Sequence, residues 1–137
     1  MTFEILEHTA DIGFRARGRT PAELFESAAE ALVAIAVELE DITERETYPL
    51  AAEGEDFESL LVNWLSEVLY WLDGKRLAMR RFRILEFTPY RVRGEGLGEP
   101  CDPARHRAKL IVKGVTYHQL KIGQEAGGWW AQVFLDI

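Results

Sequence analysis

The hydrophobic pattern of this 137-residue chain changes its period along the sequence, and that change limits the fold more than any other feature. Apolar residues recur every three to four positions over residues 20–39 and 56–74, which predicts two amphipathic helices. A capping signal at residues 20–23 opens the first helix, and Gly74 can end the second. The remaining segments alternate apolar and polar residues, as strands do. Two helices among about seven strands predict an α+β sandwich with a mixed or antiparallel sheet, folded as a single domain over residues 1–137.

The strand predictions follow this alternation. Residues 1–7 and 12–17 are expected to pair closely, around a turn at residues 8–11. Pro49 places the strand near residues 48–52 at a sheet edge or beside a bulge, because proline cannot donate to a ladder. Further strands are expected at residues 78–87, 90–97, 108–113, 116–122 and 129–137, with a turn-rich segment at residues 94–103.

The acidic residues are concentrated in the first part of the chain. Residues 1–59 carry 15 acidic and 4 basic side chains, within a formal net charge of −7 for the whole chain. This distribution counts against a general nucleic-acid-binding protein, which needs a cationic surface. It fits a protein that binds a cation, a basic protein surface or neither, and most of these glutamates are expected to be solvated helix surface.

The chain also lacks the signals of several protein classes. Its single cysteine, Cys101, excludes an internal disulfide framework and a cysteine-based zinc site. No apolar run approaches the length of about 18 residues that a transmembrane helix needs. The acidic, alternating N-terminus does not resemble a signal peptide. The sequence therefore predicts a soluble, cytoplasmic protein.

The end of the chain offers the first candidate site. The side chain of Asp136 and the α-carboxylate of Ile137 are adjacent and could converge on one ion. Ca²⁺ and Mg²⁺ prefer such hard oxygen donors, whereas two carboxylates without a cation repel each other. Asp11 is a candidate third carboxylate. The alternative is a solvated chain end.

Two histidines are weaker candidates. Residues 7–11 combine an acid, the imidazole of His8 and a hydroxyl, which suits either acid–base chemistry or hydrogen bonding within the turn. His8 and His118 could form a metal pair or an acid–base pair. Two histidines without cysteine partners are weak evidence for zinc, and a structural role is the alternative.

A third candidate lies between two predicted strands, at residues 113–118. Lys113 could bind phosphate as a point charge, with the Thr116 hydroxyl and the His118 imidazole nearby. Gly114 would permit a bulge or a close backbone approach. The segment lacks the P-loop pattern.

A basic stripe decorates the expected strand pair at residues 78–97, with aromatic residues between its charges. It could contact RNA by phosphate pairing and stacking, form a protein interface, or be a solvated face paired with helix glutamates. The arginines of the stripe are Arg80, Arg81, Arg83, Arg91 and Arg93.

Five segments of this sequence carry a family resemblance. They read FEILEHTADIGF, ELFESAAEALVAI, LLVNWLSEVLYWLD, KGVTYHQLKI and WWAQVFLDI. Together they resemble the archease family over nearly the whole chain. The His-Thr-Ala-Asp turn combined with an Asp-Ile chain end is the most specific part, and Gly114 stands where that family is expected to carry alanine.

The resemblance implies an α+β fold and a non-catalytic protein cofactor of the RtcB-type RNA ligase. Such a protein promotes guanylylation and multiple turnover of the ligase in tRNA splicing and RNA repair, with RNA contact indirect or transient and no membrane partner. The resemblance also implies a bound divalent ion, with Ca²⁺ expected first and Mg²⁺ or Mn²⁺ as alternatives. The implied ligands are Asp11, Asp136 and the terminal carboxylate of Ile137. The other positions expected on the functional surface are His8, Glu67, Lys113, Thr116 and His118.

Two other functions stay open from the sequence. One is a metal-dependent phosphoester hydrolase that uses Asp11, His8 and Asp136. The other is an RNA-binding chaperone or modification partner that uses the basic stripe.

Overall fold

The computed structural model describes residues 2–7 and 11–137. Within them lie two α-helices, eight strands, a short 3-10 turn and a π-helical turn that extends the second helix. The helical elements are α1 (Pro21–Ala36), the 3-10 turn (Leu39–Asp41), α2 (Phe57–Leu69) and the π-helical turn (Tyr70–Gly74). The strands are β1 (Thr2–Glu7), β2 (Asp11–Gly18), β3 (Glu46–Glu53), β4 (Leu77–Thr88), β5 (Arg91–Pro100), β6 (Gly114–Val115), β7 (Lys121–Glu125) and β8 (Gly128–Asp136).

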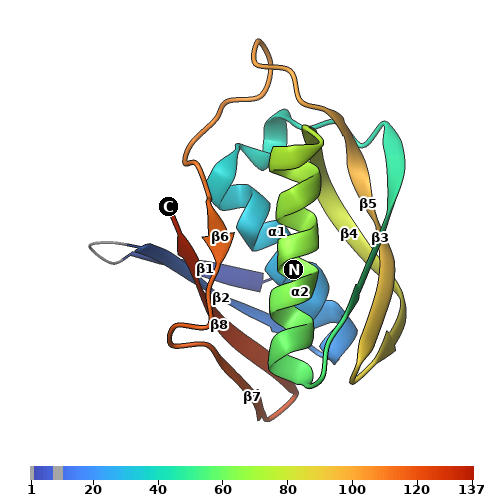
Figure 1. Cartoon of the computed structure of the whole chain (residues 1–137), viewed down its shortest axis with the longest axis vertical. Coiled ribbons are helices and arrows are strands. Elements are labelled where there is room, and N and C mark those ends of the chain that lie inside the picture. The colour runs from blue at the N-terminus through green and yellow to red at the C-terminus, as the bar shows by residue number, and fades with distance from the viewer. Residues whose placement is uncertain (1, 8–10) are drawn as a thin grey trace.

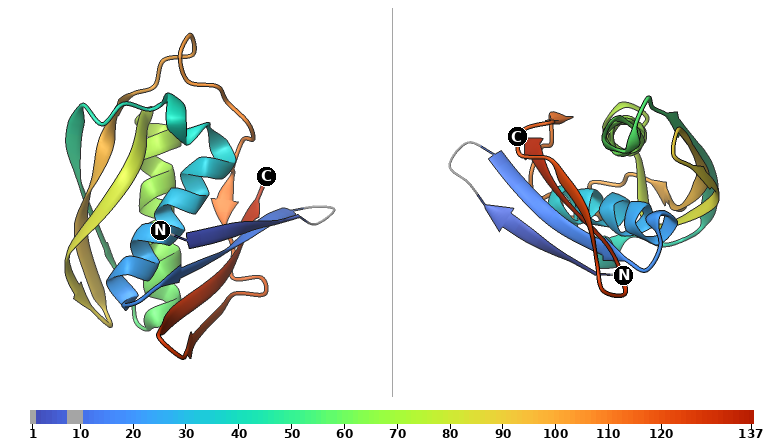
Figure 2. Two further views of the ribbon diagram at one scale, coloured as in Figure 1. Left: turned by 180° about the vertical axis from the view of Figure 1, so that it is seen from behind. Right: turned by 90° about the horizontal axis from the view of Figure 1, so that it is seen from below.

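The strands form two antiparallel sheets with the helices between them (Figure 1). In the five-stranded sheet the order is β1-β2-β8-β6, and β7 also pairs with β8; the three-stranded sheet has the order β3-β5-β4. The right-hand view of Figure 2 shows α1 between the sheets, where it packs on both β2 and β4. The α+β sandwich expected from the sequence is confirmed, as is the edge position of the strand that contains Pro49.

Both helices begin where the sequence predicted, the first at the capping signal of residues 20–23 and the second near residue 56. The Thr20 hydroxyl accepts the N–H of Glu23 at 3.1 Å, and the carboxylate of Glu23 accepts the N–H of Arg19 at 2.8 Å. At the start of α2, the carboxylate of Asp56 accepts the N–H of Ser59 at 2.8 Å. These caps satisfy backbone donors that have no partner inside the helix.

The core lies between the helices and the inner faces of both sheets. Trp64 is fully buried, and its indole N–H donates to the carbonyl oxygen of Phe25 at 3.0 Å, which joins α2 to α1. On the strands, buried side chains alternate with exposed ones, so each sheet turns one face to the helices. Among the described residues, no helix is both long enough and apolar enough to cross a membrane.

The strand expected at residues 90–97 forms as β5 and continues to Pro100, so only the last residues of the turn-rich segment expected at 94–103 lie outside a strand. Residues 94–100 belong to β5, and its glycines lie in the ladder with β4. A Cβ at Gly98 would lie 1.8 Å from the carbonyl oxygen of Ala78, so the backbones approach too closely for any side chain. The glycines therefore serve close strand packing.

The strands expected at residues 108–113 and 116–122 are also largely wrong. Only β6 and β7 form there, and residues 101–113 run irregularly across the top of the molecule (Figure 1). A single bridge, between Val37 and Ala108, replaces the expected ladder. The N–H of Lys109 instead donates to the carbonyl oxygen of Ala36 at 2.9 Å, because the segment crosses the C-terminal end of α1.

Candidate functional site

The register of β2 and β8 places Asp11 directly opposite Asp136. Side chains of such a pair project from the same face of the sheet, with Cβ atoms about 4.5–5.5 Å apart. The neighbouring residue Ile12 faces the core, so Asp11 lies on the outer face, which carries no helix. Asp11 is partly exposed and Asp136 is exposed. Two of the three carboxylates expected to hold a metal ion are thus side by side.

The backbone around Asp136 is held on both edges. Asp136 pairs with Asp11 on one side and with Gly114 on the other. Its carbonyl oxygen also accepts the N–H of Lys113 at 2.7 Å. Ile137 follows directly, with 37% of its surface exposed. Backbone hydrogen bonds on both sides therefore fix the position from which the Asp136 carboxylate projects.

The two aspartates carry like charges without a protein cation. Across residues 2–7 and 11–137, neither Asp11 nor Asp136 forms an ion pair, and no three His, Cys, Asp or Glu side chains gather closely enough to hold a metal ion. The pair alone therefore falls short of a full ligand set. A hard cation completes such a set with further carboxylate, carbonyl or water oxygens. The donor chemistry suits Ca²⁺ or Mg²⁺, while metal binding itself stays a prediction.

His118 lies on the same outer face as the aspartate pair. The centroid of its ring lies 6.3 Å from that of Phe134 in an edge-on arrangement. The backbone N–H of His118 donates to the hydroxyl of Thr116 at 3.2 Å. The ring of Phe134 covers Gly13, where a Cβ would come within 2.6 Å of it. His8 lies outside the described residues, so the proposed pairing of the two histidines does too.

The other expected surface residues surround β6. The N–H and the hydroxyl of Thr116 both donate to the carbonyl oxygen of Phe134, at 3.1 and 2.9 Å. Lys113 is exposed, and Glu67 is partly buried on α2, against which β6 packs. The close approach expected at Gly114 is not found, because a Cβ there would meet nothing within 4 Å. Alanine would fit at this position.

Three of the five arginines in the basic stripe of the three-stranded sheet are paired with carboxylates. Arg81 contacts Glu44 and Arg83 contacts Glu95, each at 2.9 Å, and Arg93 pairs with Glu86. These partners lie on strands and a loop, whereas helix glutamates were the expected ones. Pairing reduces the cationic field that RNA binding would need.

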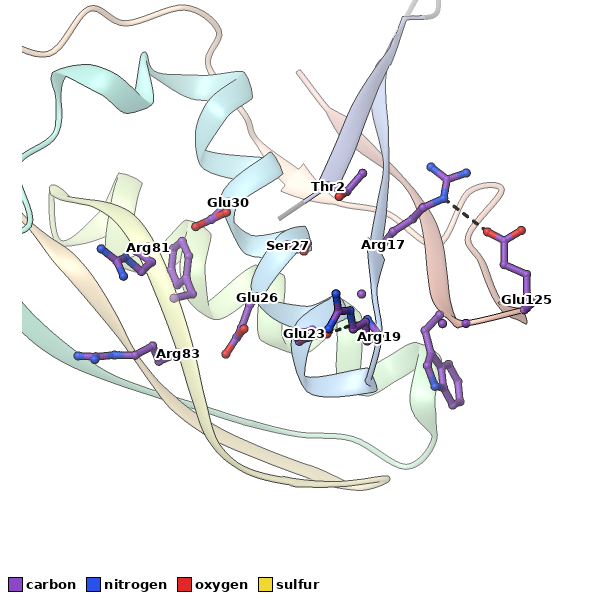
Figure 3. Close-up of a pocket in the computed structure, with 16 residues that line it drawn as sticks. Thr2, Arg17, Arg19, Glu23, Glu26, Ser27, Glu30, Arg81, Arg83 and Glu125 are labelled. Carbon is purple, nitrogen blue, oxygen red and sulfur yellow. Dashed lines mark hydrogen bonds and ion pairs between the residues drawn. The ribbon is translucent and has the colours of Figure 1, made fainter.

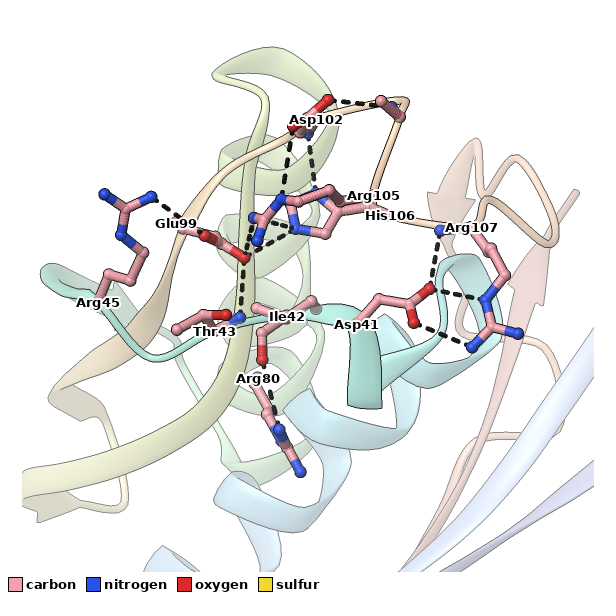
Figure 4. Close-up of polar contacts among 11 residues, drawn as sticks. Asp41, Ile42, Thr43, Arg45, Arg80, Glu99, Asp102, Arg105, His106 and Arg107 are labelled. Carbon is pink, nitrogen blue, oxygen red and sulfur yellow. Dashed lines mark hydrogen bonds and ion pairs between the residues drawn. The ribbon is translucent and has the colours of Figure 1, made fainter.

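Sequence reasoning missed a buried cluster around Glu99 (Figure 4). Glu99 is 1% exposed, and it accepts hydrogen bonds from the N–H of Thr43 at 2.8 Å, from Arg105 at 2.6 Å and from His106 at 2.9 Å. The Thr43 N–H and then the two side chains lower the pKa of Glu99 to about 2. Strand alternation places Glu99 on the outer face of β5, and only the segment that folds over it buries the side chain. No sequence signal shows that.

A second missed feature is a 770 Å³ groove along the outward side of α1 (Figure 3). Carboxylates of α1 form its floor, and arginines from β2 and β4 line its walls. Glu26 accepts the N–H of Ile84 at 2.7 Å, and burial raises the pKa of Glu30 to about 7. Neither Asp11 nor Asp136 lines this groove.

Comparison with known proteins gives a consistent result over the whole chain. Residues 3–137 match the model of the archease protein family (MTH1598/TM1083). A protein archease from Methanosarcina mazei is 38% identical over 98% of this chain and 95% of its own length. A protein archease from Pyrococcus abyssi is 40% identical over 98% of both chains.

Two solved structures are also similar. The solution structure of protein 1598 from Methanobacterium thermoautotrophicum has a TM-score of 0.81 and 31% identity, covering 98% of both chains. The crystal structure of an archease from Thermotoga maritima, described as a possible chaperone, covers 96% of this chain and 94% of its own. It has a TM-score of 0.69 at 21% identity and so shows the fold alone.

Proposed function

The chain belongs to the archease family, and on that premise we propose that it is a non-catalytic activator of an RtcB-type RNA ligase. It promotes guanylylation and multiple turnover of the ligase, in the cytoplasm, during tRNA splicing and RNA repair. A divalent ion, Ca²⁺ first and Mg²⁺ or Mn²⁺ as alternatives, is held by Asp11, Asp136 and the α-carboxylate of Ile137.

The observation that carries this proposal is the pairing of Asp11 with Asp136 across β2 and β8. Like charges directly opposite each other destabilise a sheet, and a bound cation removes that cost. A bound divalent ion would offset the negative charge of nucleotide and RNA phosphates. The chain itself supplies the oxygen donors and a β8 end whose backbone is fixed on both edges.

The surface around the aspartate pair suits contact with a partner. His118 and Lys113 are exposed beside it, and Thr116 fixes the backbone between them. We assign these residues, together with Glu67, to the surface that meets the ligase and its phosphates. Lys113 acts there as a point charge toward an anion.

The two rival functions gain less support. The RNA-binding alternative relies on a stripe of five arginines, three of which are paired with Glu44, Glu86 and Glu95. The hydrolase alternative relies on His8, which lies outside the described residues.

The test measures guanylylation and RNA ligation by a cognate ligase at limiting divalent metal, with and without this protein. We expect stimulation by the wild-type protein and none by the Asp11→Ala, Asp136→Ala double variant. A double variant that removes two exposed carboxylates at the start of α2, Glu55→Ala with Glu58→Ala, serves as the matched control and should stimulate fully. Equal stimulation by both double variants would refute the proposal.

A further inference from the structure

The irregular segment 101–113 connects the three-stranded sheet to the five-stranded sheet (Figure 1). It contains no regular strand or helix, so side chains and single backbone bonds fix its course. Its first residues lie at the Glu99 cluster (Glu99, Thr43, Arg105 and His106), and its last residue lies at the aspartate pair. The segment thus joins two acidic sites.

At its first end, the imidazole of His106 bridges the segment to the buried carboxylate (Figure 4). Nδ1 of His106 accepts the N–H of Asp102 at 2.8 Å, so the ring hydrogen belongs on Nε2. Nε2 then donates to Glu99 at 2.9 Å. Both ring nitrogens are occupied, and the His106 side chain is 4% exposed. His106 is therefore a structural bridge, because neither nitrogen is free to act as a base.

In its middle, the segment is bonded to the C-terminal end of α1 and to the 3-10 turn (Leu39–Asp41) that follows it. The guanidinium of Arg107 donates twice to Asp41, each at 2.9 Å. The N–H and the ammonium of Lys109 donate to the carbonyl oxygens of Ala36 and Ala34, at 2.9 and 2.8 Å. Carbonyls at a helix end lack partners within the helix, so these contacts stabilise both elements.

At its far end, the segment reaches the candidate site. Val112 is 4% exposed and anchors the chain in the core. The next residue, Lys113, donates its N–H to the carbonyl oxygen of Asp136 at 2.7 Å, and Gly114 continues that pairing as β6. Because β6 spans only two residues, the support for this edge of β8 depends on where the segment places it.

We propose that Glu99 and His106 are positioning residues for the aspartate pair. They fix the 101–113 segment, and the segment holds the end of β8 where Asp136 faces Asp11. This inference rests on the proposed function, which assigns a metal ion to that pair. A site whose ligands are already placed loses less conformational entropy when the ion binds, so a looser segment means weaker binding.

The experiment compares His106→Ala with Leu50→Ala, a control that opens the core beneath β3 but leaves the segment intact. We measure amide hydrogen exchange of Lys113 in chelator by NMR, and Ca²⁺ affinity by calorimetry. In His106→Ala, exchange at Lys113 should accelerate and Ca²⁺ affinity should fall about tenfold, as on loss of an outer-shell partner. His106→Gln, which can still donate to Glu99, should recover part of both.

A second variant keeps the test decisive if His106→Ala does not fold. Arg107→Gln removes an exposed contact of the segment with Asp41 and should shift both readouts in the same direction by less. If segment variants match Leu50→Ala in exchange and affinity, the positioning role is wrong. If the wild-type protein binds none of Ca²⁺, Mg²⁺ and Mn²⁺ in the same titration, the proposed function fails and this inference fails with it. Wild-type binding that segment variants leave unchanged contradicts this inference alone.

Discussion

Glu99 and the aspartate pair lie at opposite ends of the 101–113 segment, and their negative charges have opposite surroundings. Glu99 is 1% exposed and accepts hydrogen bonds from a backbone N–H, an imidazole and a guanidinium. Asp11 and Asp136 reach solvent and face each other, and within the described residues neither has a cationic partner. A carboxylate supplied with protein donors is part of the fold, whereas carboxylates that face each other provide a place for an external cation.

The substitution expected to change stability most is Glu99→Gln, which tests whether the buried carboxylate is part of the fold. We expect a loss of about 3 kcal/mol in the free energy of unfolding at pH 7, because a buried pair loses one partner. The pKa of Glu99 is lowered to about 2 from 4.5, so its stabilisation is present above pH 4.5 and disappears as the pH falls toward 2. Urea unfolding of both proteins between pH 2 and 7 should therefore show a difference in unfolding free energy that shrinks as the pH falls. A constant difference would mean that the carboxylate charge is irrelevant.

Glu30 is an intermediate case, partly buried in the groove along α1, with Oε2 unpartnered within the described structure. Burial raises its pKa from 4.5 to about 7, so its stabilising contribution is present below pH 4.5 and is lost as the pH rises through 7. Glu30→Gln should therefore gain about 1 kcal/mol over the wild type at pH 8 and nothing at pH 4. Thermal unfolding at the two pH values measures this gain.

The ion pairs of the three-stranded sheet are exposed, so they are expected to stabilise the fold much less than the buried contacts of Glu99 do. The side chain of Arg83 is 53% exposed where it contacts Glu95. Arg83→Gln should change the unfolding free energy by no more than about 0.5 kcal/mol, because exposed pairs are screened. A loss above about 2 kcal/mol, measured by urea unfolding, would place this pair with Glu99 among the structural charges.

The smallest effect is expected at the aspartate pair itself. In chelator, Asp11→Asn with Asp136→Asn should stabilise the protein by about 0.3 kcal/mol, because a like-charge contact is relieved. Chemical unfolding of the two proteins without divalent metal measures this difference. Marked destabilisation would show that the aspartates, like Glu99, have a structural role.

The parts of the fold that follow from local chemistry could be predicted from the sequence. Thr20 and Asp56 cap helices through residues only three positions away, so their signals are visible in the chain itself. The end of β5 was placed too early, at residue 97, because the close approach that requires Gly98 comes from the backbone of β4 and leaves no local signal. Residues 108–113 were misassigned as a strand because contacts with α1 replaced a ladder.

The candidate site likewise has features that the sequence shows and features that depend on contacts between distant parts of the chain. The adjacency of Asp136 and Ile137 is visible in the sequence, whereas the position of Asp11 opposite Asp136 depends on the register between the first and last parts of the chain. Glu99 and His106 could not be found, because alternation in β5 predicts an exposed carboxylate. The carboxylate of Glu99 is buried by the 101–113 segment, which has no periodic pattern that would reveal its course.

The most direct test of the central claim is a calorimetric titration of the isolated, metal-free protein with Ca²⁺. We predict one ion per chain for the wild type and no measurable binding for Asp11→Asn with Asp136→Asn. Glu55→Gln with Glu58→Gln should bind like the wild type, since those exposed carboxylates lie elsewhere. A wild-type protein that binds no Ca²⁺, Mg²⁺ or Mn²⁺, or a double asparagine variant that binds as tightly as the wild type, would contradict it.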